Sequence, residues 1–180
     1  MARRRVRLVI LCEDRQQEVF ARKFFLSRGF HHREIDPKTA PRGKGSAEQF
    51  VREQYALEVR TWRKKSTYLS ILLAVVIDAD TYTVQQRLTQ FDDTLKNSSQ
   101  QPRQPDEKIA IFVPKRNIET WIHYLMGEAV DEESVYPKLG HESDCKPYVE
   151  KLVEDICPTG LPDDAPPSLH IACDELKRIL

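Results

Sequence analysis

Two nearly continuous runs of aliphatic residues dominate the hydrophobic pattern of the chain. One extends from Val6 to Cys12 and the other from Tyr68 to Ile77. Aliphatic runs of this length are typical of strands that are buried on both faces of a parallel sheet. Two weaker segments, near Arg33 to Asp36 and at Ile109 to Val113, predict further short strands.

Between these segments the hydrophobic residues recur at helical spacing. Helices are expected over residues 16–28, 46 to about 62–65, 83–96, 118–126, 145–156 and 168–180. Ser46 and Asn117 are suited to cap the start of two of them. Because a parallel neighbour strand requires a crossover, which a helix supplies, the alternation predicts an α/β fold. We expect a mostly parallel central sheet flanked by helices, with a short helical C-terminal extension.

Composition agrees with one globular domain. The chain has 180 residues, of which 40% are hydrophobic and 31% are charged. Its four cysteines form no Cys-x-x-Cys pair, so we expect reduced thiols and a cytoplasmic location. The longest apolar run, Leu69 to Ile77, is far shorter than the roughly 20 residues of a membrane helix, so no membrane association is expected.

Charge is distributed unevenly along the chain. The 28 Lys and Arg residues balance the 28 Asp and Glu residues, which removes a global argument for nucleic-acid binding. Residues 1–65, however, hold 17 basic and 8 acidic residues, and residues 66–180 hold 11 basic and 20 acidic residues. The first third is therefore the part of the chain suited to contact phosphates.

Acidic residues follow directly after two of the predicted strands. Glu13 ends the first aliphatic run, and Asp78 and Asp80 end the second. If strand geometry continues, the two aspartates point to the same side and can share a cation with Glu13 from the neighbouring strand. Hard oxygen ligands favour Mg²⁺ or Mn²⁺, and such a site leaves room for a phosphodiester. The bland alternative is that Asp78 and Asp80 merely form a turn or helix cap.

This order of elements resembles the Toprim fold of topoisomerases, primases and the overcoming-lysogenization-defect type of nuclease. The residues that carry the resemblance are Glu13 after one aliphatic strand and Asp-x-Asp at 78–80 after another. Small stand-alone Toprim proteins of bacterial anti-phage systems are similar in layout and length. The resemblance implies a metal-dependent endonuclease, a hydrolase of phosphodiester bonds, with Glu13, Asp78 and Asp80 as metal-binding acids. Residues 1–126 would form the catalytic domain, and 127–180 a helical extension packed on the same core.

Residues near the predicted fourth helix complete the expected catalytic set. Glu119 matches an acid that the family commonly carries at the start of this helix, and with Glu18 it is a candidate for a second metal or for orienting the nucleophile. Lys115 or Arg116 could stabilise the negative charge of the transition state. The chain departs from the family at Asp14, because the family's first glutamate is usually followed by glycine.

The basic first third supplies candidate nucleic-acid contacts. Arg42 and Lys44 lie in a Pro- and Gly-rich turn just before the helix that Ser46 caps. Helix N-termini attract anions, so this turn is a plausible phosphate cradle. Together with Arg116, these residues predict binding of DNA or RNA, and the pattern does not distinguish the two.

The resemblance also implies a partner. Stand-alone Toprim proteins are often encoded beside ATPases of the ABC or recombination-repair type, so we expect such an ATPase to control the nuclease in antiviral defence. Whether the chain forms a homo-oligomer stays open.

Two alternatives remain at this point. The chain could be a non-catalytic Toprim-like subunit that binds nucleic acid or scaffolds a complex. It could instead be a flavodoxin- or receiver-like module that binds Mg²⁺ for phosphorylation or signalling. The receiver pattern requires an acidic pair after the first strand, which Glu13 and Asp14 supply, but Asp-x-Asp and the interrupted region 30–66 fit it poorly.

Overall fold

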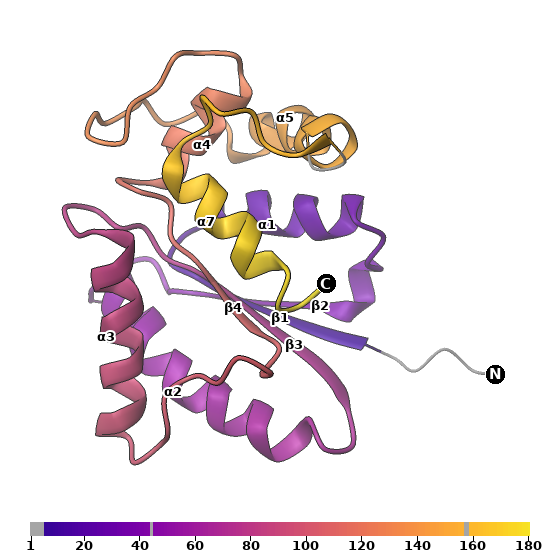
Figure 1. Ribbon diagram of the computed structural model, residues 1–180, viewed down its shortest axis with the longest axis vertical. Helices are drawn as coiled ribbons and strands as arrows, with labels where there is room; N and C mark the ends of the chain where they lie inside the picture. Colours follow the sequence, from indigo (N-terminus) through magenta and orange to yellow (C-terminus); the bar gives the residue numbers. More distant parts are fainter. Residues whose placement is uncertain (1–5, 44, 157–158) are drawn as a thin grey trace.

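A parallel sheet forms the centre of the protein. The computed structural model describes residues 6–43, 45–156 and 159–180. Within them, four strands form one sheet in the order β2-β1-β3-β4 (Figure 1). The strands are β1 (Val6–Cys12), β2 (Ile35–Thr39), β3 (Ser70–Val76) and β4 (Ile109–Phe112). All three strand pairs are parallel, which confirms the predicted α/β class.

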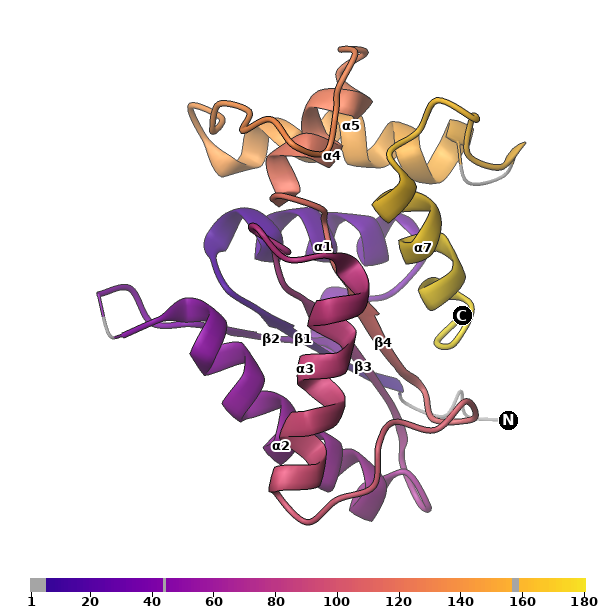
Figure 2. The same ribbon diagram turned by 60° about the vertical axis from the view of Figure 1, so that its left-hand side comes forward.

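Helices cover both faces of this sheet (Figures 1 and 2). One face carries α1 (Arg15–Ser27), α4 (Ile118–Leu125), α5 (Lys146–Lys151) and α7 (Pro167–Leu176). The other face carries α2 (Ala47–Lys65) and α3 (Val84–Asn97). Short helical turns are η1 (His32–Glu34), η2 (Glu142–Cys145) and η3 (Leu152–Ile156). None of the helices in the described ranges is long and apolar enough to span a membrane.

The two central strands are buried on both faces, as their aliphatic sequences predict. In β1, Leu8 and Ile10 face the helices on the α1 side, whereas Val9 and Leu11 face α2 and α3. The side chains of β3 alternate in the same way between the two hydrophobic clusters. A strand packed between two helical layers has no solvent-facing side, so the alternating polar positions of a half-exposed strand are absent from these two runs.

The second strand departs from the sequence prediction. It was expected near Arg33 to Asp36, but β2 begins at Ile35 and continues through Pro37 to Thr39. This strand lies at the edge of the sheet and pairs only with β1, and a proline is tolerated at an edge because one side of the strand needs no donor. The Pro- and Gly-rich turn that carries Arg42 therefore begins after Thr39.

The chain after residue 126 packs on the α1 side of the sheet. Cys145, Val149 and Leu169 belong to the same hydrophobic cluster as Leu8 and Ile10 of β1. The helix predicted over 145–156 is divided into η2, α5 and η3, and α7 ends before the predicted position 180. The division at residue 126 into a catalytic domain and an extension stays a prediction.

Candidate functional site

The connections between strands create a crevice at one edge of the sheet. The chain passes from β1 to β2 through α1, and then returns past β1 to β3 through α2 on the opposite face. In open α/β sheets, ligands bind beyond the carboxyl ends of the strands where the strand order reverses in this way. Cys12 is in register with Val76, so Glu13 and Asp78 leave the ends of neighbouring strands at nearly the same level.

Glu13 spans the gap between these two strand ends. Its Oε1 atom accepts a hydrogen bond from the backbone N–H of Asp78, with a nitrogen–oxygen distance of 2.5 Å. Gln17, which is fully buried, donates from Nε2 to the same oxygen at 3.3 Å and accepts from the Glu13 backbone N–H at 2.9 Å. Sequence reasoning did not identify Gln17. The structure thus brings Glu13 and Asp78 together, and Gln17 fixes Glu13 in place.

Asp78 connects the end of β3 to the start of α4. Its Oδ1 atom accepts a hydrogen bond from the backbone N–H of Ile118 at 3.0 Å. Asn117 occupies the N-cap position, as predicted, but its side chain makes no capping hydrogen bond. The carboxylate of Asp78 therefore caps α4 in place of the Asn117 side chain. The buried Oδ1 atom of Asn117 is left without a hydrogen-bond partner just before the helix begins.

Asp80 does not continue the strand. β3 ends at Val76, and Asp80 has a φ of 52°, in the left-handed region. Its backbone N–H donates to the carbonyl oxygen of Arg116 at 2.8 Å, and its Oδ2 atom accepts from Nη2 of Arg87 at 3.1 Å. The expectation that Asp78 and Asp80 share a side rested on continued strand geometry. Because the strand ends at Val76, before Asp80, the direction of the Asp80 side chain is set by the turn and by Arg87.

Negative charge accumulates at this edge of the sheet. The pKa of Glu13 is raised to about 7, mainly by burial and to a lesser extent by the carboxylates of Asp80 and Asp14. The hydrogen bonds from the Asp78 backbone and from Gln17 act in the opposite direction. Burial also raises the pKa of Asp78 well above its usual range, with Glu13, Asp14 and Glu119 acting in the same direction. Burial is the largest cause in both residues, and the neighbouring carboxylates add to it because like charges close together disfavour the ionised forms.

Glu119 joins this group from the first turn of α4. It is 4% exposed, and burial raises its pKa, with a further increase from Asp14. Asp14 caps α1, because its Oδ1 atom accepts from the backbone N–H of Gln17 at 2.9 Å. We call Glu13, Asp14, Asp78, Asp80 and Glu119 the acidic cluster. Asp14 thus has a structural role as a helix cap and adds a carboxylate to the cluster.

In their present arrangement the acids do not surround a common point. Among the described residues, no group of three or more His, Cys, Asp or Glu side chains is placed to hold a metal ion. One reason is visible in the contacts: Oε1 of Glu13 accepts hydrogen bonds from the Asp78 backbone and from Gln17. Hard oxygen atoms are nevertheless the correct donors for Mg²⁺ or Mn²⁺, and the unpartnered Asn117 oxygen adds one more. The donor set therefore fits such an ion, whereas its convergence requires movement of the side chains.

A cleft of about 800 Å³ opens in front of part of the cluster. Glu13, Asp14 and Glu119 line it, whereas Asp78 and Asp80 do not. One wall is the loop that follows β2, and the other is the segment between α4 and η2. Three cations also line the cleft: Arg15, Arg42 and Lys138. This combination of acids and cations suits a phosphodiester, whose oxygens need positive partners.

The predicted phosphate contacts have different outcomes in this cleft. Arg42 lies on its wall with its side chain 88% exposed, 3.7 Å from Glu142 on the opposite wall. Lys44 lies outside the described residues. Lys138 was missed, because it follows α4 in an irregular segment with no motif, yet its ammonium group lowers the pKa of Glu119. Lys138 and Glu119 are therefore close in space.

Two predicted cations do not line the cleft. The Nζ atom of Lys115 donates to the carbonyl oxygen of Tyr82 at 2.9 Å on the surface. Arg116 has a φ of 67° and contributes its carbonyl oxygen to the turn at Asp80. Glu18, the other candidate acid, accepts from Oγ1 of Thr39 at 2.8 Å. In this arrangement Lys115 and Arg116 support the Asp-x-Asp turn through backbone and surface contacts.

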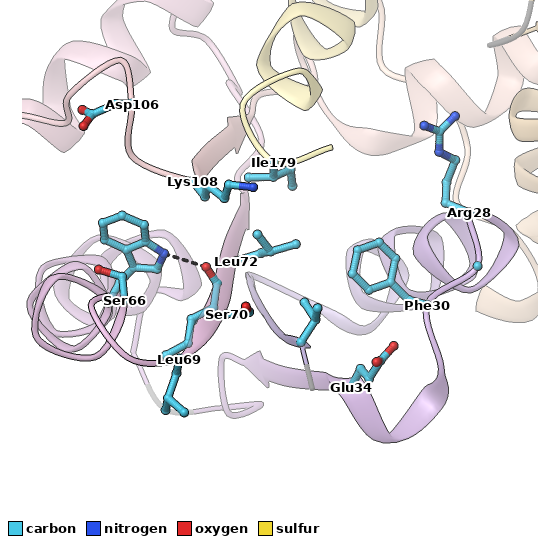
Figure 3. Close-up of a pocket in the computed structure, with 14 residues that line it drawn as sticks. Arg28, Phe30, Glu34, Ser66, Leu69, Ser70, Leu72, Asp106, Lys108 and Ile179 are labelled. Carbon is cyan, nitrogen blue, oxygen red and sulfur yellow. Dashed lines mark hydrogen bonds between the residues drawn. The ribbon is translucent and has the colours of Figure 1, made fainter. Parts of the chain in front are cut away.

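A second hollow, of about 550 Å³, lies at the opposite edge of the sheet (Figure 3). Residues at the start of β1 and β3 line it, with Phe30, Leu72 and Ile179 around its centre. Its charged lining residues have both signs: Arg28, Lys108, Glu34 and Asp106. This hollow lies at the amino ends of the strands, away from the acidic cluster, so the candidate site is the cleft at the carboxyl edge.

No protein-family model, curated protein or solved structure matches the chain. The candidate site is therefore defined by the geometry of the acidic cluster and its cleft.

Proposed function

We propose that the protein is a Mg²⁺-dependent endonuclease, with Mn²⁺ as an alternative ion. The observation that carries the proposal is the hydrogen bond from the Asp78 backbone to Glu13, which joins the acid-bearing ends of β1 and β3 beside a cation-lined cleft. A metal-dependent nuclease requires hard oxygen donors next to a place for a phosphate, and this edge of the sheet has both.

Glu13, Asp78 and Asp80 are the residues that would hold the ion. A bound divalent cation would polarise a phosphate oxygen and lower the pKa of a water molecule. The position of Glu13 and Asp78 at the ends of neighbouring strands supports this assignment, and a bound cation would lower the pKa values that burial and, to a lesser extent, neighbouring carboxylates raise.

The cleft residues would bind and orient the phosphodiester. Arg42 and Lys138, on opposite walls, would bind the non-bridging oxygens and neutralise charge that develops during phosphoryl transfer. Glu119, buried with a raised pKa, would accept a hydrogen bond from the attacking water and orient it. These roles need no movement of the sheet, since all three residues already line the same cleft.

We further propose that a separately encoded ATPase of the ABC or recombination-repair type controls this nuclease in antiviral defence in the cytoplasm. This part rests on the resemblance to stand-alone Toprim proteins. The net charge of zero supports it, because autonomous binding of nucleic acid relies on excess positive charge. Cys12 and Cys145 are buried thiols without a disulfide, which agrees with a reducing compartment.

A non-catalytic, Toprim-like scaffold is the second candidate. The observation that favours it is that Glu13 and Asp78 each accept a backbone hydrogen bond that connects two elements of the fold, which is a structural role for both acids. The receiver-like alternative has less support. A receiver module also requires a lysine at the end of its fifth strand, whereas the described sheet has four strands and Lys115, after the last of them, donates to the carbonyl oxygen of Tyr82.

The test is cleavage by the purified chain, with and without the ATPase, on DNA and RNA in Mg²⁺, Mn²⁺ or chelator. We expect cleavage that requires the metal and is lost in Asp78→Asn. Asp174→Asn is the matched control, because Asp174 is exposed on α7 and pairs with Lys177. Equal activity of wild type and Asp78→Asn would exclude the nuclease site, and metal-independent assembly with nucleic acid but no cleavage would support the scaffold.

A further inference from the structure

Arg87 in the first turns of α3 is a buried cation next to the acidic cluster. Its side chain is 2% exposed, and every nitrogen of its guanidinium group has a partner. Nε donates to the carbonyl oxygen of Asp78 at 3.1 Å, and Nη2 donates to Oδ2 of Asp80 at 3.1 Å. The guanidinium group therefore holds both ends of the Asp78–Asp80 segment.

The other side of the guanidinium group is anchored to two helices. Nη1 donates to Oε1 of Glu48 on α2 at 2.6 Å and to Oε1 of Gln90 on α3 at 2.9 Å. The ring of Tyr82 lies 4.6 Å from the guanidinium carbon. These contacts leave the guanidinium group little freedom to rotate. Through Arg87, the position of the Asp80 side chain thus depends on α2 and α3.

Such an anchor is needed because of the conformation of Asp80. A residue with a φ of 52° lies in a turn, where the backbone does not continue the strand alternation that would direct its side chain. The Asp80 side chain is 58% exposed, so packing does not direct it either. The hydrogen bond from Arg87 engages Oδ2, so Oδ1 is the carboxylate oxygen through which Asp80 would bind an ion.

We propose that Arg87 is a positioning residue that orients Asp80 for metal binding and that Glu48 holds Arg87 in place. This inference rests on the proposed nuclease function and adds the residues that organise its metal site. Partners that orient a metal ligand typically change metal affinity by about 10- to 100-fold when they are removed. A similar effect is expected here, although Arg87 itself contacts no metal or substrate.

The test measures metal binding without substrate. Mn²⁺ is titrated into the full chain and the free ion is followed by electron paramagnetic resonance, for wild type, Arg87→Lys and Glu48→Gln. Lysine keeps the positive charge but loses the planar, multidentate geometry of arginine. We expect Arg87→Lys to bind Mn²⁺ about tenfold or more weakly and to shift the Mg²⁺ concentration for half-maximal cleavage by the same factor. We expect the cleavage rate at saturating Mg²⁺ to change by less than about threefold.

Arg103→Lys is the matched control. Arg103 is a comparably buried arginine, 9% exposed, that pairs with Glu175 on α7 and lies outside the acidic cluster. A purely structural effect of replacing a buried arginine would appear in both lysine variants, as a lower melting temperature. Only Arg87→Lys should also change Mn²⁺ affinity.

Each outcome decides the inference. If Arg87→Lys and Glu48→Gln bind Mn²⁺ as the wild type does, the positioning role is wrong and the nuclease proposal stands. If Arg87→Lys does not fold, Glu48→Gln decides: weaker Mn²⁺ binding supports the inference, and unchanged binding overturns it. If the wild type neither binds Mn²⁺ nor cleaves, the proposed function fails and the inference fails with it.

Discussion

The Oδ1 atom of Asp78 lies 3.0 Å from the backbone nitrogen of Ile118 and accepts its hydrogen bond, so the acid after β3 caps α4. The same helix carries Glu119 in its first turn. The carboxylate of Asp78 thereby fixes the start of this helix, 40 residues further along the chain at Ile118, and with it the position of Glu119. Asp78 therefore has a structural role beside the metal-binding role that we propose for it, and experiments have to separate the two.

The Asp78→Asn variant separates the two roles. An amide oxygen still accepts the hydrogen bond from Ile118, so we expect a melting temperature close to that of the wild type. Asparagine lacks the charge needed to hold a divalent cation, so we expect cleavage to fall by more than about 100-fold. Thermal unfolding and initial cleavage rates measure the two effects. A variant with unchanged cleavage would show that Asp78 serves only as a cap.

The metal-free protein should become less stable as the pH rises from 4.5 to about 7, the interval between the ordinary and the folded-state pKa of Glu13. A raised pKa means that the folded state holds a proton that the unfolded state has already released, so the free energy of unfolding falls with increasing pH. We expect a loss of about 1–3 kcal/mol across this interval, measured by urea unfolding in chelator.

Glu13→Gln tests the origin of this pH dependence. Glutamine does not titrate, so its free energy of unfolding should fall less between pH 5 and pH 8 than that of the wild type. Some dependence should remain, because the pKa values of Asp78 and Glu119 are also raised. Parallel profiles for variant and wild type would assign the effect to other groups.

The sequence predicted the frame of the fold because the frame depends on burial. β1 and β3 are covered by helices on both faces, so each is a continuous aliphatic run with an acid at its end. The acids that follow these two runs, Glu13 and Asp78, therefore lie at neighbouring strand ends, as predicted. The bounds of β2 were predicted wrongly, because an edge strand that contains a proline lacks the aliphatic run of a central strand.

The organisation of the site was only partly predictable. Asp80 follows the end of β3 and adopts a left-handed backbone conformation. Aspartate tolerates this conformation, but its presence in a sequence does not predict it. Arg87 had a detectable signal: it lies three residues after Val84 and four before Phe91, on the apolar face of α3. A charged residue at such a position needs a buried partner. Lys138 had no comparable signal, because an irregular segment brings it to the cleft.

Gln17 should be required for the stability and alignment of Glu13. Replacing it with leucine removes the donor to Oε1 and leaves the buried backbone N–H of Glu13 without its acceptor. We expect the free energy of unfolding to fall by about 1–3 kcal/mol and cleavage to decrease more than stability alone explains. Denaturant unfolding and activity at a temperature where the variant is folded measure both. Gln49→Ala, an exposed glutamine on α2, is the control and should change stability by less than about 0.5 kcal/mol.

Arg42 and Lys138 should contribute to nucleic-acid affinity through the phosphate backbone. Each bound phosphate releases counterions, so Arg42→Ala or Lys138→Ala should reduce the slope of log affinity against log salt by about 0.7–0.9. The melting temperature should not change for Arg42→Ala, because that side chain is 88% exposed. Lys138→Ala should also raise the pKa of Glu119, whose proton affinity the ammonium group now lowers. Fluorescence anisotropy in chelator at several salt concentrations measures binding without cleavage, with Lys177→Ala on α7 as the control. Salt slopes that are equal in wild type and both cleft variants would place the nucleic acid elsewhere on the protein.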